Sequence, residues 1–453
     1  MTRPKHPRPP LRPLVLGAIV ALLGCGGSHA VQQSEMSYAG GDVARSTATA
    51  EVATESDYGG GEMAPAPMGG AAVAADEAMA PAAPSATTVT TTTTVTVTVD
   101  TPPPVQQVQP ERALTAATVA DHDRRGNYLD YLRRHPYEAQ RLGLDMTRRL
   151  RFRVVDARGQ ALHDARLQLQ VAGRTVQGRT HADGVWDYFP GLDQTAGSAT
   201  VVVEANGARG QAQVHVPSQG DGQDVVLRLD QVQARAPRVL DLGFLIDVTG
   251  SMEDELRFVN REVADIVARV SAESPETQVR VGAVFYRDRT DHPALQRIAF
   301  THDVHGFAQA MQSVHASGGG DYPEDLNAGL QQALVGLGWS GAGAVRTLVV
   351  ISDAPPQRYP TAFGYREAML QASAQGIRLL PVAASGADRE VEFLFRAMAT
   401  TTSSPYVYLT DDSGIGNPHM EADTDRVAVE YFHDLLTRLV IDDLHGQGMH
   451  EAI

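Results

Sequence analysis

Residues 238 to about 444 alternate between short apolar runs and amphipathic segments, which predicts strands alternating with helices. The run Leu240–Ile246 is almost continuously apolar and ends on Asp247, as is typical of a strand buried on both faces of a sheet. Further strands are predicted at Gln278–Tyr286, Gln296–Thr301, Arg346–Ile351, Ile377–Val382 and Tyr406–Leu409, and helices at Met252–Val270, Val304–His315, Pro323–Leu337, Ala362–Ala374, Arg389–Ala399 and Asp425–Leu444. This order predicts an α/β fold over 237–444, with a doubly wound, mostly parallel sheet.

The segment before it has a different period. From Leu150 to about residue 231, apolar positions alternate with polar ones, and turn-forming Asp and Gly residues separate the runs. This pattern predicts a small all-β sandwich at 150–231. Its D-x-x-G and T-x-A-D-G-x-W patterns, the second at Thr180–Trp186, resemble Ig-like domains of the carboxypeptidase-regulatory type. The resemblance implies a spacer or a protein-binding module. Residues 113–149 are predicted to be a helical segment, with one helix over Leu114–Arg134.

The first residues have the pattern of a secretion signal. Four cationic residues precede the apolar stretch Leu14–Leu23, which is shorter than the roughly 20 residues that span a bilayer. Leu22–Cys25 resembles the bacterial lipobox, which implies a signal peptide at 1–24 and acylation of Cys25. An ordinary signal peptide with a chance cysteine is the alternative. Residues 25–112 are rich in Ala, Gly, Thr and Pro, and this composition predicts a disordered tether.

Composition excludes several kinds of chemistry. Cys25 is the only cysteine, so lipidation would leave no thiol for a disulfide, a zinc site or catalysis. Lys5 is the only lysine, which excludes a P-loop and a Schiff-base lysine from the mature chain. Removing the signal would change the formal charge from −16 to −20 because four cations leave with it. So acidic a protein is not expected to bind nucleic acid or anionic lipid directly.

Candidate chemistry is concentrated where strands end. Asp247, Thr249 and Ser251 follow the first buried strand at two-residue spacing. The carboxyl ends of strands in such sheets are where ligands bind, and carboxylate and hydroxyl oxygens suit Mg²⁺, Ca²⁺ or Mn²⁺. Two later segments carry similar groups, S-G-G-G-D-Y-P-E-D at Ser317–Asp325 and T-L-V-V-I-S-D-A-P-P at Thr347–Pro356.

These three segments resemble, in order, the three loops of the metal-ion-dependent adhesion site in the von Willebrand factor type A (vWA) family. The resemblance implies that Thr249 and Ser251 give hydroxyl oxygens to a divalent cation, most simply Mg²⁺, with Ca²⁺ and Mn²⁺ as alternatives. It places Asp247 and Asp353 beside the cation, directly or through water. Asp321 stands where integrin-like members have a threonine, so the site would carry one more negative charge.

Nearby residues have other interpretations. Glu324 and Asp325 are expected to cap the next helix rather than bind metal. Arg287, in a Tyr-Arg-Asp strand end, is expected either at the rim of the site or in a salt bridge with Asp288 or Asp291. His315 is the nearest residue by sequence that could act as a general base.

The sequence therefore favours a non-enzymatic role. The expected protein is a lipid-anchored lipoprotein of the bacterial cell envelope, held at the outer membrane, that binds a partner protein through its cation. The membrane would be contacted through the lipid alone. Two alternatives remain open: a metal-dependent hydrolase that activates water, and a spacer that has kept only the fold.

Overall fold

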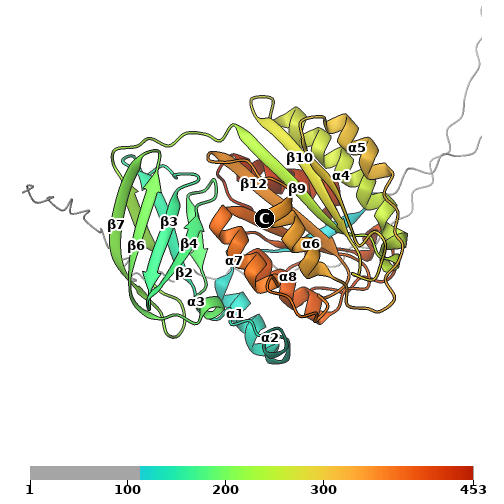
Figure 1. Ribbon diagram of the computed structural model, residues 1–453, viewed down its shortest axis with the longest axis horizontal. Helices are drawn as coiled ribbons and strands as arrows, with labels where there is room; N and C mark the ends of the chain where they lie inside the picture. The colour runs from blue at the N-terminus through green and yellow to red at the C-terminus, as the bar shows by residue number, and fades with distance from the viewer. Residues whose placement is uncertain (1–112, 452–453) are drawn as a thin grey trace, which may run out of the picture. The chain divides into compact units, whose positions relative to one another are not determined.

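The computed structural model describes residues 113–451 (Figure 1). The predicted signal peptide, Cys25 and the tether lie outside these residues. Within the described range, no helix combines the length and apolar character needed to cross a bilayer.

The α/β part is built on one eight-stranded sheet. Its strands follow the order β11-β10-β9-β12-β13-β14-β1-β15, and β10, β9, β12, β13 and β14 are parallel to one another. The bounds are β9 (Val239–Asp247), β10 (Gln278–Tyr286), β11 (Leu295–Thr301), β12 (Ala344–Ser352), β13 (Ile377–Ala383) and β14 (Tyr406–Leu409). The doubly wound, mostly parallel sheet predicted from the sequence is confirmed.

Helices cover both faces of this sheet (Figure 1). Alternate residues of a strand point to opposite faces. Phe244 and Ile246 accordingly pack in one core and Leu245 in the other. The first core is covered by α4 (Glu253–Glu273), α5 (Val304–Gln312) and α9 (Phe432–Leu444), and the second by α6 (Leu326–Gln331), α7 (Tyr365–Gln375) and α8 (Arg389–Thr401). A π-helical turn, Gln332–Gly336, continues α6.

The prediction of a helix from Leu114 is wrong at its start. Thr115–Val119 is strand β1, which pairs antiparallel with β14 and with the short β15 (Glu430–Tyr431). Helix α1 begins only at Arg125, and α9 begins at Phe432 rather than at Asp425. The partner of β1 lies almost 300 residues away in sequence, as in the pair Ala116–Leu409. Local periodicity carries no information on such a pairing.

After β1 the chain forms α1 (Arg125–Arg134) and α2 (Pro136–Leu142), which pack on α8. Tyr131 of α1 lies against Phe393, and the Arg396 guanidinium lies 3.6 Å from the centre of the Tyr131 ring. Arg396 also forms a two-pronged ion pair with Asp121, with both N–O distances 2.7 Å. Both charged side chains are buried, so the segment that follows β1 is held by charge as well as by apolar packing.

Residues 150–229 form two sheets around a common core. One contains β2 (Leu150–Asp156), β5 (Val185–Tyr188) and β8 (Val225–Leu229). The other contains β3 (Arg166–Val171), β4 (Arg174–Arg179), β6 (Gly197–Ala205) and β7 (Ala208–Val216), and a short helix α3 (Pro190–Asp193) follows β5. Trp186 fills the core against Phe152, and a Cβ at Gly178 would lie 1.9 Å from the Trp186 ring. Glycine at 178 is therefore a packing requirement.

Polar contacts join this sandwich to the α/β part. The Trp186 indole donates a hydrogen bond to the Ser373 hydroxyl of α7 at 2.8 Å. Fully buried Arg378 of β13 pairs with both Asp183 of the sandwich and Asp443 of α9 at 2.7 Å. Buried charges in such a junction must remain paired. One face of the sandwich therefore packs against the α/β part and is not available to a partner protein.

The Asp121–Arg396 pair predicts a measurable stability effect. Asp121→Asn removes one of the two carboxylate charges that pair with buried Arg396, and Glu392 still pairs with it at 3.1 Å. The free energy of unfolding should therefore fall by about 1.5–3 kcal/mol. Denaturant unfolding of the full chain measures it. Asp230→Asn is the matched control, because the exposed Arg228–Asp230 pair should change stability by no more than about 0.5 kcal/mol. Equal stability of the two variants would contradict the role given to Asp121.

Candidate metal centre

The candidate site is positioned by the ends of three adjacent parallel strands. Asp247 is the last residue of β9, and its register partner is Tyr286, the last residue of β10. On the other side, Ile351 of β12 pairs with Ile246, which brings Ser352 level with Asp247. The carboxyl ends of the strands therefore deliver Asp247, Ser352 and the following Asp353 to one edge of the sheet.

Asp247 is fully buried and held by hydrogen bonds from several directions. Its Oδ1 accepts from the Thr249 backbone N–H at 3.0 Å and from the Thr249 hydroxyl at 2.7 Å. Its Oδ2 accepts from the Ser352 hydroxyl at 3.0 Å, and that hydroxyl accepts in turn from Tyr286 at 2.7 Å. The Thr249 and Ser251 hydroxyls lie 3.2 Å apart. Three of the predicted site residues are thus in one connected group.

Asp353 belongs to the same group and is incompletely satisfied. Burial and the charge of Asp247 raise the pKa of Asp353 to about 7, although a hydrogen bond from Ser251 opposes the shift. Its Oδ1 is buried and has no hydrogen-bond partner among the described residues. A buried carboxylate oxygen without a partner is costly, and a bound cation is one of the few groups that would satisfy it.

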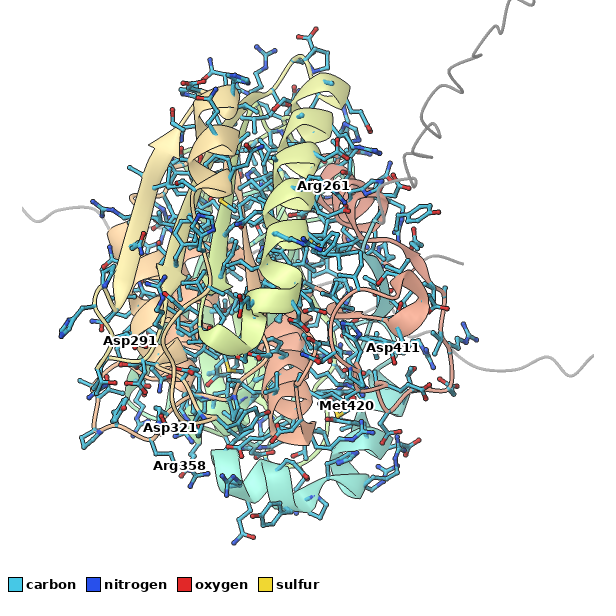
Figure 2. The ribbon with its side chains drawn as sticks, turned by 90° about the vertical axis from the view of Figure 1, so that its right-hand side faces the viewer. Arg261, Asp291, Asp321, Arg358, Asp411 and Met420 are labelled. Atoms are coloured by element: carbon cyan, nitrogen blue, oxygen red, sulfur yellow. The ribbon has the colours of Figure 1, made fainter. Side chains whose placement is uncertain are left out.

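The fifth predicted residue, Asp321, lies at the rim. It is exposed, and its Oδ2 accepts a hydrogen bond from the Gln357 amide at 2.6 Å. In Figure 2 it is labelled at the same end of the molecule as Asp291 and Arg358. The hydrogen-bonded group therefore contains four of the five residues, of which Asp247, Thr249 and Asp353 are buried and Ser251 is exposed, and Asp321 adds charge from outside it.

The expectation that Glu324 caps a helix is wrong, whereas that for Asp325 is confirmed. Asp325 Oδ1 accepts from the Ala328 N–H at the start of α6. Glu324 is instead buried, and burial together with Asp247 and other nearby acidic groups raises its pKa to about 9. Its Oε2 has no hydrogen-bond partner within residues 113–451. The Glu324 backbone is held by the loop after β12, because its N–H donates a hydrogen bond to the Pro355 carbonyl. This contact places the Glu324 side chain in the interior and not at the start of α6.

Arg287 follows neither predicted interpretation. Its guanidinium is buried and donates to three backbone carbonyls, those of Val248, Pro293 and His315, at 3.0–3.2 Å. Arg287 thus ties together the three segments that surround the site. Hydrogen-bond geometry of this kind leaves no sequence pattern, because the acceptors are main-chain oxygens.

The glycine-rich segment is folded back onto the first loop. The Ser317 N–H donates to the Val248 carbonyl, and the Gly250 N–H donates to the Gly318 carbonyl. Gly318 has φ +79°, and a Cβ there would lie 2.5 Å from the Asp291 carboxylate. The positive φ and this close approach both require glycine, so the run supports a tight turn beside the site.

The donor set fits a hard divalent cation. Asp247, Thr249, Ser251 and Asp353 offer carboxylate and hydroxyl oxygens from one hydrogen-bonded group, and these are the ligand atoms that Mg²⁺ and Ca²⁺ prefer. Within residues 113–451, buried Asp353 and Glu324 each keep an oxygen that has no hydrogen-bond partner. His315, the residue considered as a general base, is exposed and contacts this region through its backbone carbonyl.

Comparison with known families agrees with this geometry. The family described as von Willebrand factor A domain matches residues 241–416. The chain contains a vWA domain. The match covers all three loops of the site and ends before β15 and α9. Strand β1 therefore completes the vWA sheet from outside the matched region. No curated protein matches the sequence.

Among solved structures, the chain is similar to the pilus adhesin SpaC from Lactobacillus rhamnosus GG. The open conformation of that adhesin shares 13% identity with a TM-score of 0.33, and the match covers 62% of this chain and 34% of the adhesin. A second form shares 11% identity with the same TM-score, covering 55% of this chain and 34% of the adhesin. The chain thus spans about a third of the adhesin's length.

The crowded carboxylates of the vWA domain predict a pH dependence in the absence of metal. Glu324 has a folded pKa of about 9, above its ordinary value of 4.5, so its contribution to stability is present below pH 4.5 and is lost as pH rises toward 9. Chelator-treated wild type should therefore lose stability between pH 5 and 9, and Glu324→Gln should lose less. Thermal unfolding across this range measures the difference.

The matched control is Glu276→Gln, because Glu276 is exposed. It should reproduce the wild-type pH dependence. If the melting temperatures of wild type and Glu324→Gln fall equally between pH 5 and 9, the placement of Glu324 among the buried carboxylates is contradicted.

Proposed function

We propose that the vWA domain binds one divalent cation and, through it, a partner protein. Asp247, Thr249, Ser251 and Asp353 would hold the cation, with Asp321 at the rim. The observation that carries this proposal is the oxygen cluster around buried Asp247 and Asp353, in which Asp353 Oδ1 has no hydrogen-bond partner in the described part of the chain. The cost of such a cluster is explained if a cation is its normal occupant.

Mg²⁺ is the proposed cation, with Ca²⁺ and Mn²⁺ as alternatives. Asp247 is already oriented by Thr249 and Ser352, so its carboxylate needs little rearrangement to face a small ion. When bound, the cation would supply an open coordination position for an oxygen atom of the partner. Ser251 is exposed, and its hydroxyl would therefore lie between the buried cluster and the partner.

Charge limits which partner groups gain from this site. Asp247, Asp321 and Asp353 together carry three formal negative charges against two from the cation. A partner carboxylate would consequently gain less here than at a site with a neutral balance. Protonation of Glu324, whose pKa is raised to about 9, keeps a fourth charge away at neutral pH. We propose that the partner is an extracytoplasmic protein that supplies an oxygen ligand to the cation. The proposed role of the chain is binding and not catalysis.

The metal proposal predicts selective loss of cation binding. Titration calorimetry with Mg²⁺, Mn²⁺ and Ca²⁺ on the full chain should detect one site. Asp247→Ala and Ser251→Ala should each weaken it at least about tenfold, because each removes an oxygen from the first loop. Saturating metal should also raise the wild-type melting temperature. Ser218→Ala, at an exposed serine of the sandwich, is the control and should bind as wild type does.

Partner binding is then tested with the same variants. Wild type should retain a protein from envelope extracts with Mg²⁺ but not with EDTA, and Ser251→Ala should lose that protein. Equal cation affinity in wild type and Asp247→Ala would contradict the metal site. If the chain binds a cation but retains the same extract protein with Mg²⁺ and with EDTA, only the proposed role of the cation in partner binding is contradicted. The chain would then be a spacer that is stabilised by metal.

We also propose that the protein is anchored in the bacterial envelope, at the outer membrane, by lipid on Cys25. Cys25 lies outside the described residues, and the support is the lipobox-like Leu22–Cys25 sequence. Cys25→Ser should shift the protein from the detergent-requiring membrane fraction to the soluble one, or leave the signal uncleaved. Cell fractionation and intact mass measure this. A processed Cys25→Ser protein that still needs detergent would contradict lipid anchoring.

A further inference from the structure

A second group of metal-ligand side chains lies where the two ends of the described chain meet. His122 and Asp123 follow β1, and His450 follows α9. Each offers one ligand atom, and these atoms all lie within 4.8 Å of one another. His450 Nδ1 is 2.6 Å from Asp123 Oδ2, and His122 Nε2 is 3.5 Å from Asp123 Oδ1. None of these residues belongs to the vWA site.

His122 is the unusual member of this group. Its side chain is only 4% exposed, and neither ring nitrogen has a hydrogen-bond partner among the described residues. A buried imidazole normally satisfies at least one nitrogen. Burial lowers the pKa of His122 to about 4, so the ring is neutral at neutral pH and has one nitrogen with a free lone pair.

His450 is already oriented as a ligand would be. Its Nε2 donates to the Gln447 carbonyl at 2.7 Å, and such a bond to a backbone oxygen commonly fixes the tautomer of a metal-binding histidine. The other nitrogen, Nδ1, lies 2.6 Å from Asp123 Oδ2. Burial lowers the pKa of His450, but the hydrogen bond and charge of Asp123 outweigh it and raise the pKa overall, so a cation would have to displace the Nδ1 proton. The His450 side chain is 55% exposed, which leaves an entry route for an ion from solvent.

The surroundings permit a cation. A pocket of about 230 Å³ is lined by all three residues together with Arg151 and Asp183. The Arg151 charge is paired with Asp187 at 2.7 Å. Arg378, whose charge acts on His122, is paired with Asp183 and Asp443 at 2.7 Å. Two of the nearby positive charges are thus matched by carboxylates, while Arg153 also lines the pocket.

We propose that His122, Asp123 and His450 form a second metal site, selective for an imidazole-preferring divalent cation such as Zn²⁺. Two ring nitrogens and one carboxylate oxygen are a ligand set that suits Zn²⁺ rather than Mg²⁺. Ligand atoms about 2 Å from a tetrahedral zinc ion lie about 3.3 Å apart, so atoms now within 4.8 Å of one another would have to approach by up to about 1.5 Å to close the site. The ion would fasten the C-terminal segment to the segment that follows β1.

The test is Zn²⁺ titration calorimetry on the full chain without a histidine tag, in excess Mg²⁺ to occupy the vWA site. Wild type should bind one Zn²⁺, and Co²⁺ should give visible absorption bands at the same stoichiometry. His450→Asn and Asp123→Asn should each weaken binding at least about tenfold. His450 and Asp123 are exposed, so both variants should fold, and circular dichroism checks this.

Two controls separate this site from other metal-binding groups. His445→Asn removes an exposed histidine five residues away and should bind Zn²⁺ as wild type does. Asp247→Ala disables the vWA site and should also retain Zn²⁺. Absence of Zn²⁺ binding in wild type would overturn the proposal. So would equal Zn²⁺ affinity in wild type and His450→Asn, or loss of Zn²⁺ binding in Asp247→Ala.

Discussion

The parallel pairing of β9 with β10 on one side and β12 on the other is the constraint on which the rest of the α/β structure depends. Because β9 is buried on both faces, the residue at its carboxyl end is the one that can reach a ligand at this edge of the sheet, and that residue is Asp247. The same register brings Tyr286 and Ser352 to the level of Asp247. A strand shifted by one residue would exchange the faces of every core side chain, so the position of the site and the packing of the core are fixed together.

Burial of several carboxylates at one edge has a physical cost that the fold must offset. Asp247, Asp353 and Glu324 are all buried, and the pKa of Asp353 and that of Glu324 are raised to about 7 and about 9. The two helical layers and the carbonyl contacts of Arg287 hold the loops in place despite this repulsion. The close approach of these buried carboxylates is electrostatically unfavourable unless protons or a cation offset their charge. This is the physical basis for proposing a metal-dependent role.

The vWA sheet is also not confined to the residues that resemble the family. Strand β1 enters it beside β14, and the buried Asp121–Arg396 pair fixes the chain just after β1. Contacts such as Trp186–Ser373 and Arg378–Asp183 attach the sandwich to the same body. The described segment before the sandwich therefore contains, besides helices α1 and α2, a strand of the same sheet.

By itself, the sequence determined the alternation of strands and helices, the change of period near Leu150, and the grouping of Asp247, Thr249 and Ser251 at one strand end. These features depend on apolar periodicity and short spacing, which are local and therefore readable along the chain. Other features became visible only in the tertiary structure. Thr115–Val119 is a strand, Glu324 is buried and Asp321 lies at the rim. Arg287 donates to backbone carbonyls, and His122 lies close to His450. Each of these depends on partners distant in sequence or on main-chain oxygens that every residue carries, so no residue pattern could reveal it before the chain folds.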